Sequence, residues 1–198
     1  MDLTTLQNVK DYLGVPIASQ ADDLFLAALI SRASALCEKY CDRVLGQATY
    51  TDEEYDGRDS DSIWLKQYPV ASVANVKIDG SLLAASDYVL YKDQGRIRKK
   101  SGNFAGSNID SAGVLSDARA PGVRNVTVTY TAGYATIPLD LEQAVIELVK
   151  RKYQHRQKGD ENIVSRTLPG GESVSYSVAD LLPETKMVLD MYRRRETV

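Results

Sequence analysis

The sequence predicts an α+β fold in which a small helical bundle carries an inserted antiparallel β region. Near both ends of the chain, apolar residues recur at steps of three and four, as they do along one face of a helix. Between residues 48 and 134 the pattern changes to short runs of β-branched and aromatic residues separated by Gly, Asp and Asn, which is typical of strands joined by turns.

Three helices are expected to form the bundle. Leu6, Val9 and Leu13 define a helix over about residues 5–13, with Thr4 at capping distance before it and Gly14 as a stop after it. A second helix, over about 20–42, has one continuous apolar stripe. The third begins at Pro138 and ends near residue 158 in a cluster of Lys and Arg, where positive charge suits the helix dipole.

The remaining segments complete a single domain over residues 1–198, with 1–45 and 138–158 as helical core and 48–134 as the β insertion. Asp79-Gly80 predicts a tight hairpin turn, and 101–122 a long irregular loop. Residues 160–198 are expected to form a flexible C-terminal arm that carries a short helix from Pro183. The expected strands are Ala48–Tyr55, Ile63–Leu65, Val73–Ile78, Tyr88–Tyr91, Ile97–Arg98 and Asn125–Tyr130.

Composition excludes several classes of protein. Hydrophobic residues make up 43% and charged residues 26%, which is close to the globular average and argues against wholesale disorder. We expect neither a membrane span nor a signal peptide, and therefore a protein of the cytosol in which it is made. The net charge of −3 gives no global attraction to nucleic acid.

The sequence contains few residues suited to catalysis or metal binding. The single histidine, His155, lies in a basic helix end, where neighbouring cations weaken it as a base. Cys37 and Cys41 continue the apolar stripe of their helix and are expected to be packed thiols rather than zinc ligands. We expect no enzymatic activity, no catalytic or metal site and no cofactor.

Two charged clusters are candidate interaction sites. The acidic one lacks the spacing of an EF-hand, and its flanking tyrosines suggest a solvated hairpin rim. The basic one follows apolar residues of the last helix. It is either only a helix C-terminus that carries cations, or part of a helix that cannot bury its apolar face unaided and docks on a partner. The acidic cluster is Asp52, Glu53, Glu54, Asp56, Asp59 and Asp61, and the C-terminal anchors are Val188, Met191, Tyr192, Arg193, Arg194 and Arg195.

An ordered set of short sequence motifs makes the chain resemble a known protein family. They include Leu3-Thr4-Thr5-Leu6, Ala21-Asp22-Asp23-Leu24, Tyr68-Pro69-Val70, Ile78-Asp79-Gly80, the run from Val126 to Tyr134, Gly170-Gly171-Glu172 and Leu182-Pro183. This succession resembles the head–tail connector (head-completion adaptor) family of long-tailed bacteriophages, over nearly the whole chain. The 101–122 insertion and the larger β portion depart from the plainer members of that family.

The resemblance implies a structural virion protein and brings no catalytic residues. Such a subunit forms a homo-oligomeric ring, commonly a dodecamer, which docks on the portal at the head–tail junction and receives the next neck, stopper or tail-completion protein. Assembly takes place in the host cytoplasm. In that setting the C-terminal anchors are expected to bind the portal, and the acidic cluster to line the channel and repel passing DNA, without sequence-specific binding.

Three other interpretations remain open. One is another neck or tail-completion component. A second is a DNA-binding protein that uses Arg96, Arg98, Lys99 and Lys100, or the terminal arginines, on phosphates. The third is an enzyme whose site is assembled between subunits.

Overall fold

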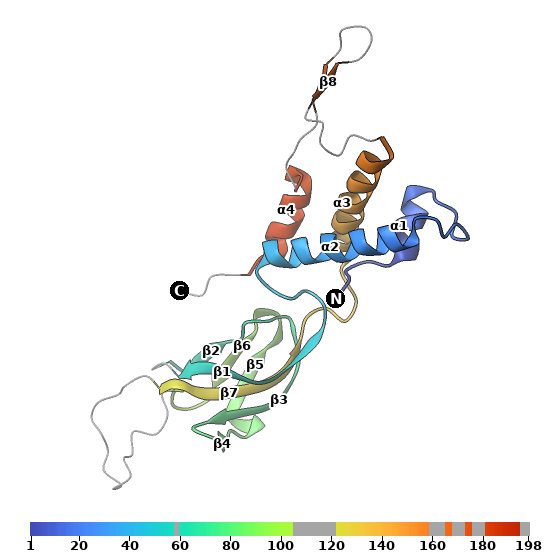
Figure 1. The fold of residues 1–198 in the computed structure, drawn as a ribbon. Helices are drawn as coiled ribbons and strands as arrows, with labels where there is room; N and C mark the ends of the chain where they lie inside the picture. The colour runs from blue at the N-terminus through green and yellow to red at the C-terminus, as the bar shows by residue number, and fades with distance from the viewer. Residues whose placement is uncertain (58–59, 105–121, 159–164, 168–172, 176–180, 195–198) are drawn as a thin grey trace. The chain divides into compact units, whose positions relative to one another are not determined.

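The computed structural model of the chain describes residues 1–57, 60–104, 122–158, 165–167, 173–175 and 181–194. It divides into two compact units. The helical unit combines Met1–Gly46 with Thr136–Arg195, and the β unit is Gln47–Ala135 (Figure 1). Helices in one unit and the two larger antiparallel sheets in the other confirm the predicted α+β class.

The helical unit is built around two long helices that cross. These are α2 (Asp23–Cys41) and α3 (Leu139–Lys158), and the shorter α1 (Leu6–Leu13) and α4 (Pro183–Tyr192) both contact them. The predicted apolar stripe of α2 is buried, with Leu26 and Cys37 fully inaccessible, and α2 packs against α3, in which Leu141 and Val145 are also buried. None of the described helices is both long and apolar enough to cross a membrane.

The starts of the first two helices differ from the sequence prediction. Thr5, not Thr4, caps α1, because the Thr5 side chain accepts a hydrogen bond from the Asn8 amide at 3.2 Å. Thr4 instead donates to Glu142 of α3 at 2.8 Å. Helix α2 begins at Asp23 rather than near residue 20, and the Asp22 side chain accepts from the Tyr153 hydroxyl at 2.8 Å instead of capping.

The β unit contains two antiparallel sheets. One has the order β1 (Ala48–Gly57), β7 (Gly122–Ala132), β3 (Val70–Ile78) and β4 (Ser81–Leu82). The other has the order β2 (Ser62–Trp64), β6 (Arg96–Lys99) and β5 (Tyr88–Tyr91). Two short 3-10 turns, η1 (Ala85–Asp87) and η2 (Lys92–Gln94), flank β5.

The two sheets share one core. Ile63 and Ile97 of the three-stranded sheet pack with inward side chains of the four-stranded sheet, among them Val76, Val128 and Tyr130. Successive side chains of a strand point to opposite faces, so each sheet has a second face directed away from this core. The two outer faces therefore lie on opposite sides of the β unit.

The predicted turn at Asp79-Gly80 is confirmed. Both residues have positive φ, 50° and 78°, as the tight turn of a two-residue hairpin requires, and Ile78 pairs with Ser81 beyond them. Strand β4, which this turn creates, was not expected from the sequence. Of the predicted 101–122 loop, residues 105–121 lie outside the described part of the chain.

The C-terminal arm contains one hairpin that the sequence did not indicate. Strands β8 (Ser165–Thr167) and β9 (Ser173–Ser175) pair antiparallel. The other residues from 159 to 180 lie outside the description, as do Arg195 and the three residues after it, so the predicted flexibility of the arm stays a prediction. Described residues resume at Leu181, just before α4.

Candidate interaction surfaces

Helix α4 packs against its own unit. Leu189 is fully inaccessible and Thr185 almost so. The Tyr192 hydroxyl donates to both carboxylate oxygens of Asp140 at 2.7 and 2.8 Å, and the Tyr40 hydroxyl donates to Asp190 at 2.8 Å. Part of the apolar side of α4 therefore has a site within the chain.

The opposite side of α4 carries exposed apolar residues. Met187 and Met191 are one helical turn apart and are 72% and 70% exposed, whereas Val188 and Tyr192 are half-buried. Of the predicted apolar anchors, Met191 alone faces solvent fully. Sequence reasoning missed Met187, although its spacing of four from Met191 was a usable signal.

The first two C-terminal arginines, Arg193 and Arg194, lie at the end of α4 in the helical unit. The Arg194 amide donates to the Cys41 carbonyl at 2.8 Å, and its guanidinium lies 3.7 Å from the Asp42 carboxylate. Arg193 is exposed and ends the helix, and Arg195 lies outside the described residues. The Arg43 Nε donates to the Tyr192 carbonyl at 2.6 Å, so the end of α4 is fixed to the end of α2.

The predicted acidic cluster does not form one surface. Strand β1 has a bulge between Tyr50 and Glu53, with Asp52 at a φ of 46°. The bulge shifts the alternation of side chains, so Glu53 points to the inner face with Tyr55, while Asp52 and Glu54 point outward. Asp61 precedes β2 in the other sheet, and Asp59 lies outside the described residues.

Glu53 is the centre of a hydrogen-bonded group. Its Oε2 accepts from the hydroxyls of Tyr55 and Tyr130, both at 2.6 Å, and its Oε1 lies 3.2 Å from the Lys66 amine. Burial on its own would raise the pKa of Glu53, but the hydrogen bonds from Tyr130, Tyr55 and Lys66 hold it below its ordinary value. Burial, followed by the hydrogen bond to Glu53, raises the pKa of both tyrosines.

The other described carboxylates of the cluster also have partners. Asp52 lies 3.1 Å from the Lys77 amine, and Asp61 lies 2.6 Å from the Arg98 Nε. Asp56 accepts from the Arg124 amide at 2.9 Å, and the Arg124 guanidinium is 3.6 Å from Glu54. These pairs reduce the negative field that the unpaired cluster would produce.

The outer face of the three-stranded sheet combines aromatic and cationic side chains. The Arg96 guanidinium lies 4.2 Å from the Tyr91 ring centre and 5.4 Å from that of Trp64, so it is held between two rings. Trp64 is 42% exposed. Strand register places these residues together, and we call the outer residues of this sheet, which are Ser62, Trp64, Val89, Tyr91, Arg96 and Arg98, the arginine–aromatic face.

The outer face of the four-stranded sheet has a different chemistry. Thr49 pairs across the strands with Thr131, and their hydroxyls lie 3.1 Å apart. The Thr129 hydroxyl accepts a hydrogen bond from the Asp52 amide at 3.0 Å, and Thr127 lies opposite Glu54 in the strand register. We call Thr49, Asp52, Glu54, Thr127, Thr129 and Thr131 the threonine–carboxylate face.

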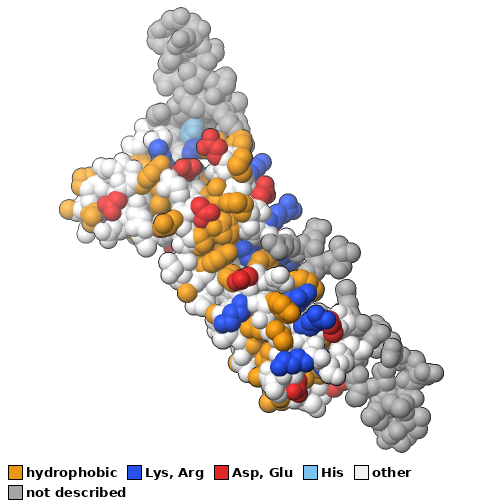
Figure 2. Space-filling view, turned by 180° about the vertical axis from the view of Figure 1, so that it is seen from behind, with side chains coloured by type: hydrophobic (Ala, Val, Ile, Leu, Met, Phe, Trp, Pro, Cys, Tyr) orange, Lys and Arg blue, Asp and Glu red, His pale blue; other side chains and the backbone are white. Residues whose placement is uncertain are grey.

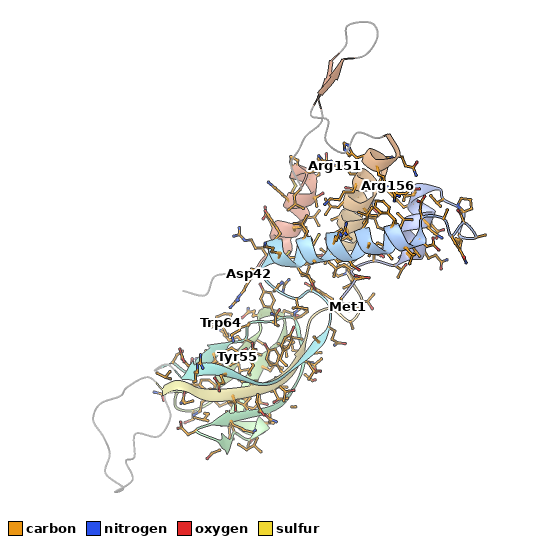
Figure 3. All side chains as sticks on the ribbon, viewed as in Figure 1. Met1, Asp42, Tyr55, Trp64, Arg151 and Arg156 are labelled. Atoms are coloured by element: carbon orange, nitrogen blue, oxygen red, sulfur yellow. The ribbon has the colours of Figure 1, made fainter. Side chains whose placement is uncertain are left out.

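Figures 2 and 3 help to locate the first of these faces. In Figure 1 strands β5 and β6 lie behind β1 and β7, and the reverse view in Figure 2 shows Lys and Arg side chains around hydrophobic ones on the β unit. Figure 3 labels Trp64 on β2 of one sheet and Tyr55 on β1 of the other.

From the sequence alone, Arg96 and Arg98 are considered only as possible phosphate ligands. Trp64 and Tyr91 cannot be placed beside Arg96 without the structure, because that arrangement depends on the strand register.

The residues considered for catalysis or metal binding are two buried cysteines and a histidine in a basic helix end. Cys37 and Cys41 are buried free thiols, and burial raises their pKa values to about 12 and about 11. Among the described residues there is no group of three or more His, Cys, Asp or Glu placed to hold a metal ion. His155 lies in the last turns of α3 beside Arg156, whose guanidinium stacks 3.8 Å from the Phe25 ring centre.

Comparison with known proteins identifies the class of this chain. The family model described as "Head completion protein" matches residues 2–195. Comparison with curated protein sequences gives no match. Because the family model covers nearly the whole chain, the chain belongs to the head completion protein family, and it is a structural protein of a phage head–tail connector, or neck.

Solved structures with a similar fold come from gene transfer agent (GTA) particles. A chain in the neck of the empty GTA particle, computed with C6 symmetry, has a TM-score of 0.60 and 19% identity, over 99% of this chain and 92% of that one. A chain in the neck of the native GTA particle, computed with C12 symmetry, gives 0.53 and 19%, over 98% and 90%. A chain in the virion of the native particle gives 0.52 and 20%, over 99% and 92%. At these identities the likeness concerns the fold.

Proposed function

We propose that the chain forms a homo-oligomeric ring of twelve copies that docks on the portal protein and joins the DNA-filled head to the neck and tail. The family match over residues 2–195 carries this proposal. The C12 symmetry of a solved neck with the same fold supports the copy number. The ring assembles in the host cytoplasm and becomes part of the virion at the head–tail junction, where it also receives the next stopper or tail-completion protein.

The solvent side of α4 is the proposed portal-binding surface. We revise the predicted anchors: Met187 joins Met191 as the apolar pair because both are exposed, whereas Val188 and Tyr192 are half-buried and Tyr192 is bonded to Asp140. Arg193, at the end of the helix, and Arg195 supply positive charge beyond this pair, while Arg194 is already near Asp42. Flexible thioether side chains suit a contact that must adapt to a second ring of different shape.

A channel-facing acidic rim at residues 52–61 stays a prediction. It receives limited support, because Glu53 points into the β unit and each of Asp52, Glu54 and Asp61 has a cation nearby. DNA binding through β6 is likewise less favoured. Arg98 is paired with Asp61, and the Lys99 amine donates to the Asn103 carbonyl at 2.8 Å.

The portal contact can be tested on the full-length chain. We would measure co-sedimentation of the purified protein with portal rings and with DNA-filled, tail-less heads. The test variant is Met187→Ser with Met191→Ser, which removes apolar area without touching the buried Leu189. The matched control is Glu184→Ser with Lys186→Ser, two exposed positions on the same helix. A deletion of 183–198 is a poor test, because it removes buried parts of the helical unit.

We expect the methionine variant to lose binding to portal and heads while its thermal unfolding stays that of the wild type. The control should bind normally. Equal binding by both variants would move the portal contact elsewhere on the chain. A wild-type protein that binds neither portal nor heads, and whose absence leaves heads and tails joined normally, would contradict the proposed function itself.

A further inference from the structure

The two outer faces of the β unit differ in side-chain type, and each presents a charged group that the other could pair with, Arg96 on one and Glu54 on the other. The arginine–aromatic face presents Trp64, Tyr91 and Arg96, and the threonine–carboxylate face presents Glu54 among rows of threonines. They lie on opposite sides of the same unit, because both sheets direct their other faces to one core. A ring of identical subunits requires this arrangement, with two different surfaces on each copy.

Arg96 is prepared to bind a carboxylate from outside its own chain. The two rings hold its guanidinium in place, which reduces the conformational freedom that binding would remove. Within the described part of the chain no carboxylate forms an ion pair with Arg96; its Nε is buried and has no acceptor, so an external carboxylate would have to bind the terminal nitrogens of the guanidinium. Trp, Tyr and Arg are also the residue types that dominate the binding energy of protein interfaces.

Glu54 is the available carboxylate on the opposite face. Its side chain is 51% exposed, and its cation, Arg124, is 74% exposed at 3.6 Å, so this pair contributes little and is easily exchanged. Asp52, by comparison, is engaged by Lys77 and by the hydroxyl and amide contacts with Thr129. The methyl groups of the neighbouring threonines offer a flat surface against which Trp64 and Tyr91 can pack.

We propose that the β unit forms the subunit contact of the ring, with the arginine–aromatic face of one copy packed on the threonine–carboxylate face of the next, and Arg96 paired with Glu54 of that copy. This inference rests on the proposed ring. A two-fold contact between two arginine–aromatic faces would place Arg96 against Arg96, which is unfavourable. A nucleic acid on this face would meet an Arg98 already neutralised by Asp61.

Charge reversal with mixing tests the pairing in full-length protein. The single variants are Arg96→Glu and Glu54→Arg, and assembly is measured by mass in solution and by imaging of rings, alone and on tail-less heads. Each single variant places like charges at every subunit contact, and we expect the contact to weaken by about 30-fold or more. In an equimolar mixture the two variants can alternate around the ring, which restores opposite charges at every contact.

We therefore expect neither variant to assemble alone and the mixture to assemble, as should the chain that carries both reversals. This double variant also guards against a folding defect, because defects in folding would add in it whereas interface charges become complementary again. Arg32→Glu, at an exposed position of α2, is the control for net charge and should assemble as the wild type does.

The outcomes separate the two proposals. Rings of normal mass from either single variant, or no recovery in the mixture and in the double variant, would overturn the Arg96–Glu54 contact and leave the ring in place. A wild-type chain that forms no ring in solution or on heads would contradict the proposed function, and this inference with it.

Discussion

Tyr130 of β7 donates its hydroxyl to Glu53 of β1 at 2.6 Å, and this bond lies on the inner side of the four-stranded sheet. Tyr55 donates to the same oxygen, and its hydroxyl lies 3.1 Å from that of Tyr130. The sequence predicts that Glu53 lies in a solvated rim, whereas the structure places its carboxylate on the inner side of the sheet, where it links β1 to β7. Its removal should affect stability more than assembly.

Glu53→Gln should destabilise the protein by about 1–3 kcal/mol at pH 7, because two tyrosine hydroxyls lose a charged acceptor. The pKa of Glu53 is lowered in the folded state, so its stabilising effect is present above the unfolded-state pKa and is lost as the pH falls through the folded-state value. Urea unfolding of variant and wild type should therefore converge in acid. Glu54→Gln, on the outer face, should change little, and a constant difference across the acid range would contradict this account.

Gly57→Ala should destabilise the β unit by about 1–3 kcal/mol or more. An added Cβ would lie 2.0 Å from the Phe104 carbonyl oxygen and 2.2 Å from Asn125 Oδ1, the atom that accepts the Gly57 amide hydrogen bond at 2.7 Å. Thermal unfolding measures the effect, with the exposed Thr51→Ala on the same strand as control. If Gly57→Ala melted at the wild-type temperature, Phe104 and Asn125 would have to move away from residue 57 at no cost, which would contradict this prediction.

Lys10→Met should loosen the segment between α1 and α2. Lys10 is 3% exposed, and its amine donates to the carbonyls of Ile17 and Ser19 at 3.2 and 2.6 Å and pairs with Asp23. Methionine keeps the chain length but leaves those acceptors without their donor, at a cost of about 1–3 kcal/mol. Limited proteolysis should cut residues 14–22 faster, while the exposed Lys39→Met should digest like the wild type.

Cys41 should report whether α4 is in place. Its thiol is inaccessible, donates to the Leu189 carbonyl at 3.5 Å, and has a pKa raised, chiefly by burial, to about 11. In a Cys37→Ser background the native chain should react slowly with a thiol reagent at pH 8. Leu189→Ala should cost about 2–5 kcal/mol and accelerate that reaction. Equal rates would mean that α4 remains seated without Leu189.

Periodicity was sufficient to predict the helices and most strands, because the apolar patterns of α1, α2, α3 and the β unit match what each element buries. It failed where a single residue changes the alternation. The bulge at Asp52 has no sequence signal, so the inward position of Glu53 could not be foreseen.

The candidate surfaces were less predictable than the fold, because they depend on partners distant in sequence. Asp140 and Asp190 engage tyrosines of other helices and fix which side of α4 faces solvent, which the sequence of α4 alone leaves open. Trp64, Tyr91 and Arg96 likewise meet only through the register of three strands.

The interruption of the helical unit by the β unit has a consequence for synthesis on the ribosome. All strands of the two large sheets have been made once residue 135 has left the exit tunnel, whereas α1 and α2 must wait for α3 and, much later, for α4. During that interval the apolar side of α2 lacks its cover. A nascent chain therefore acquires a finished helical surface only after α4 has been made, which delays any partner that recognises that surface until then.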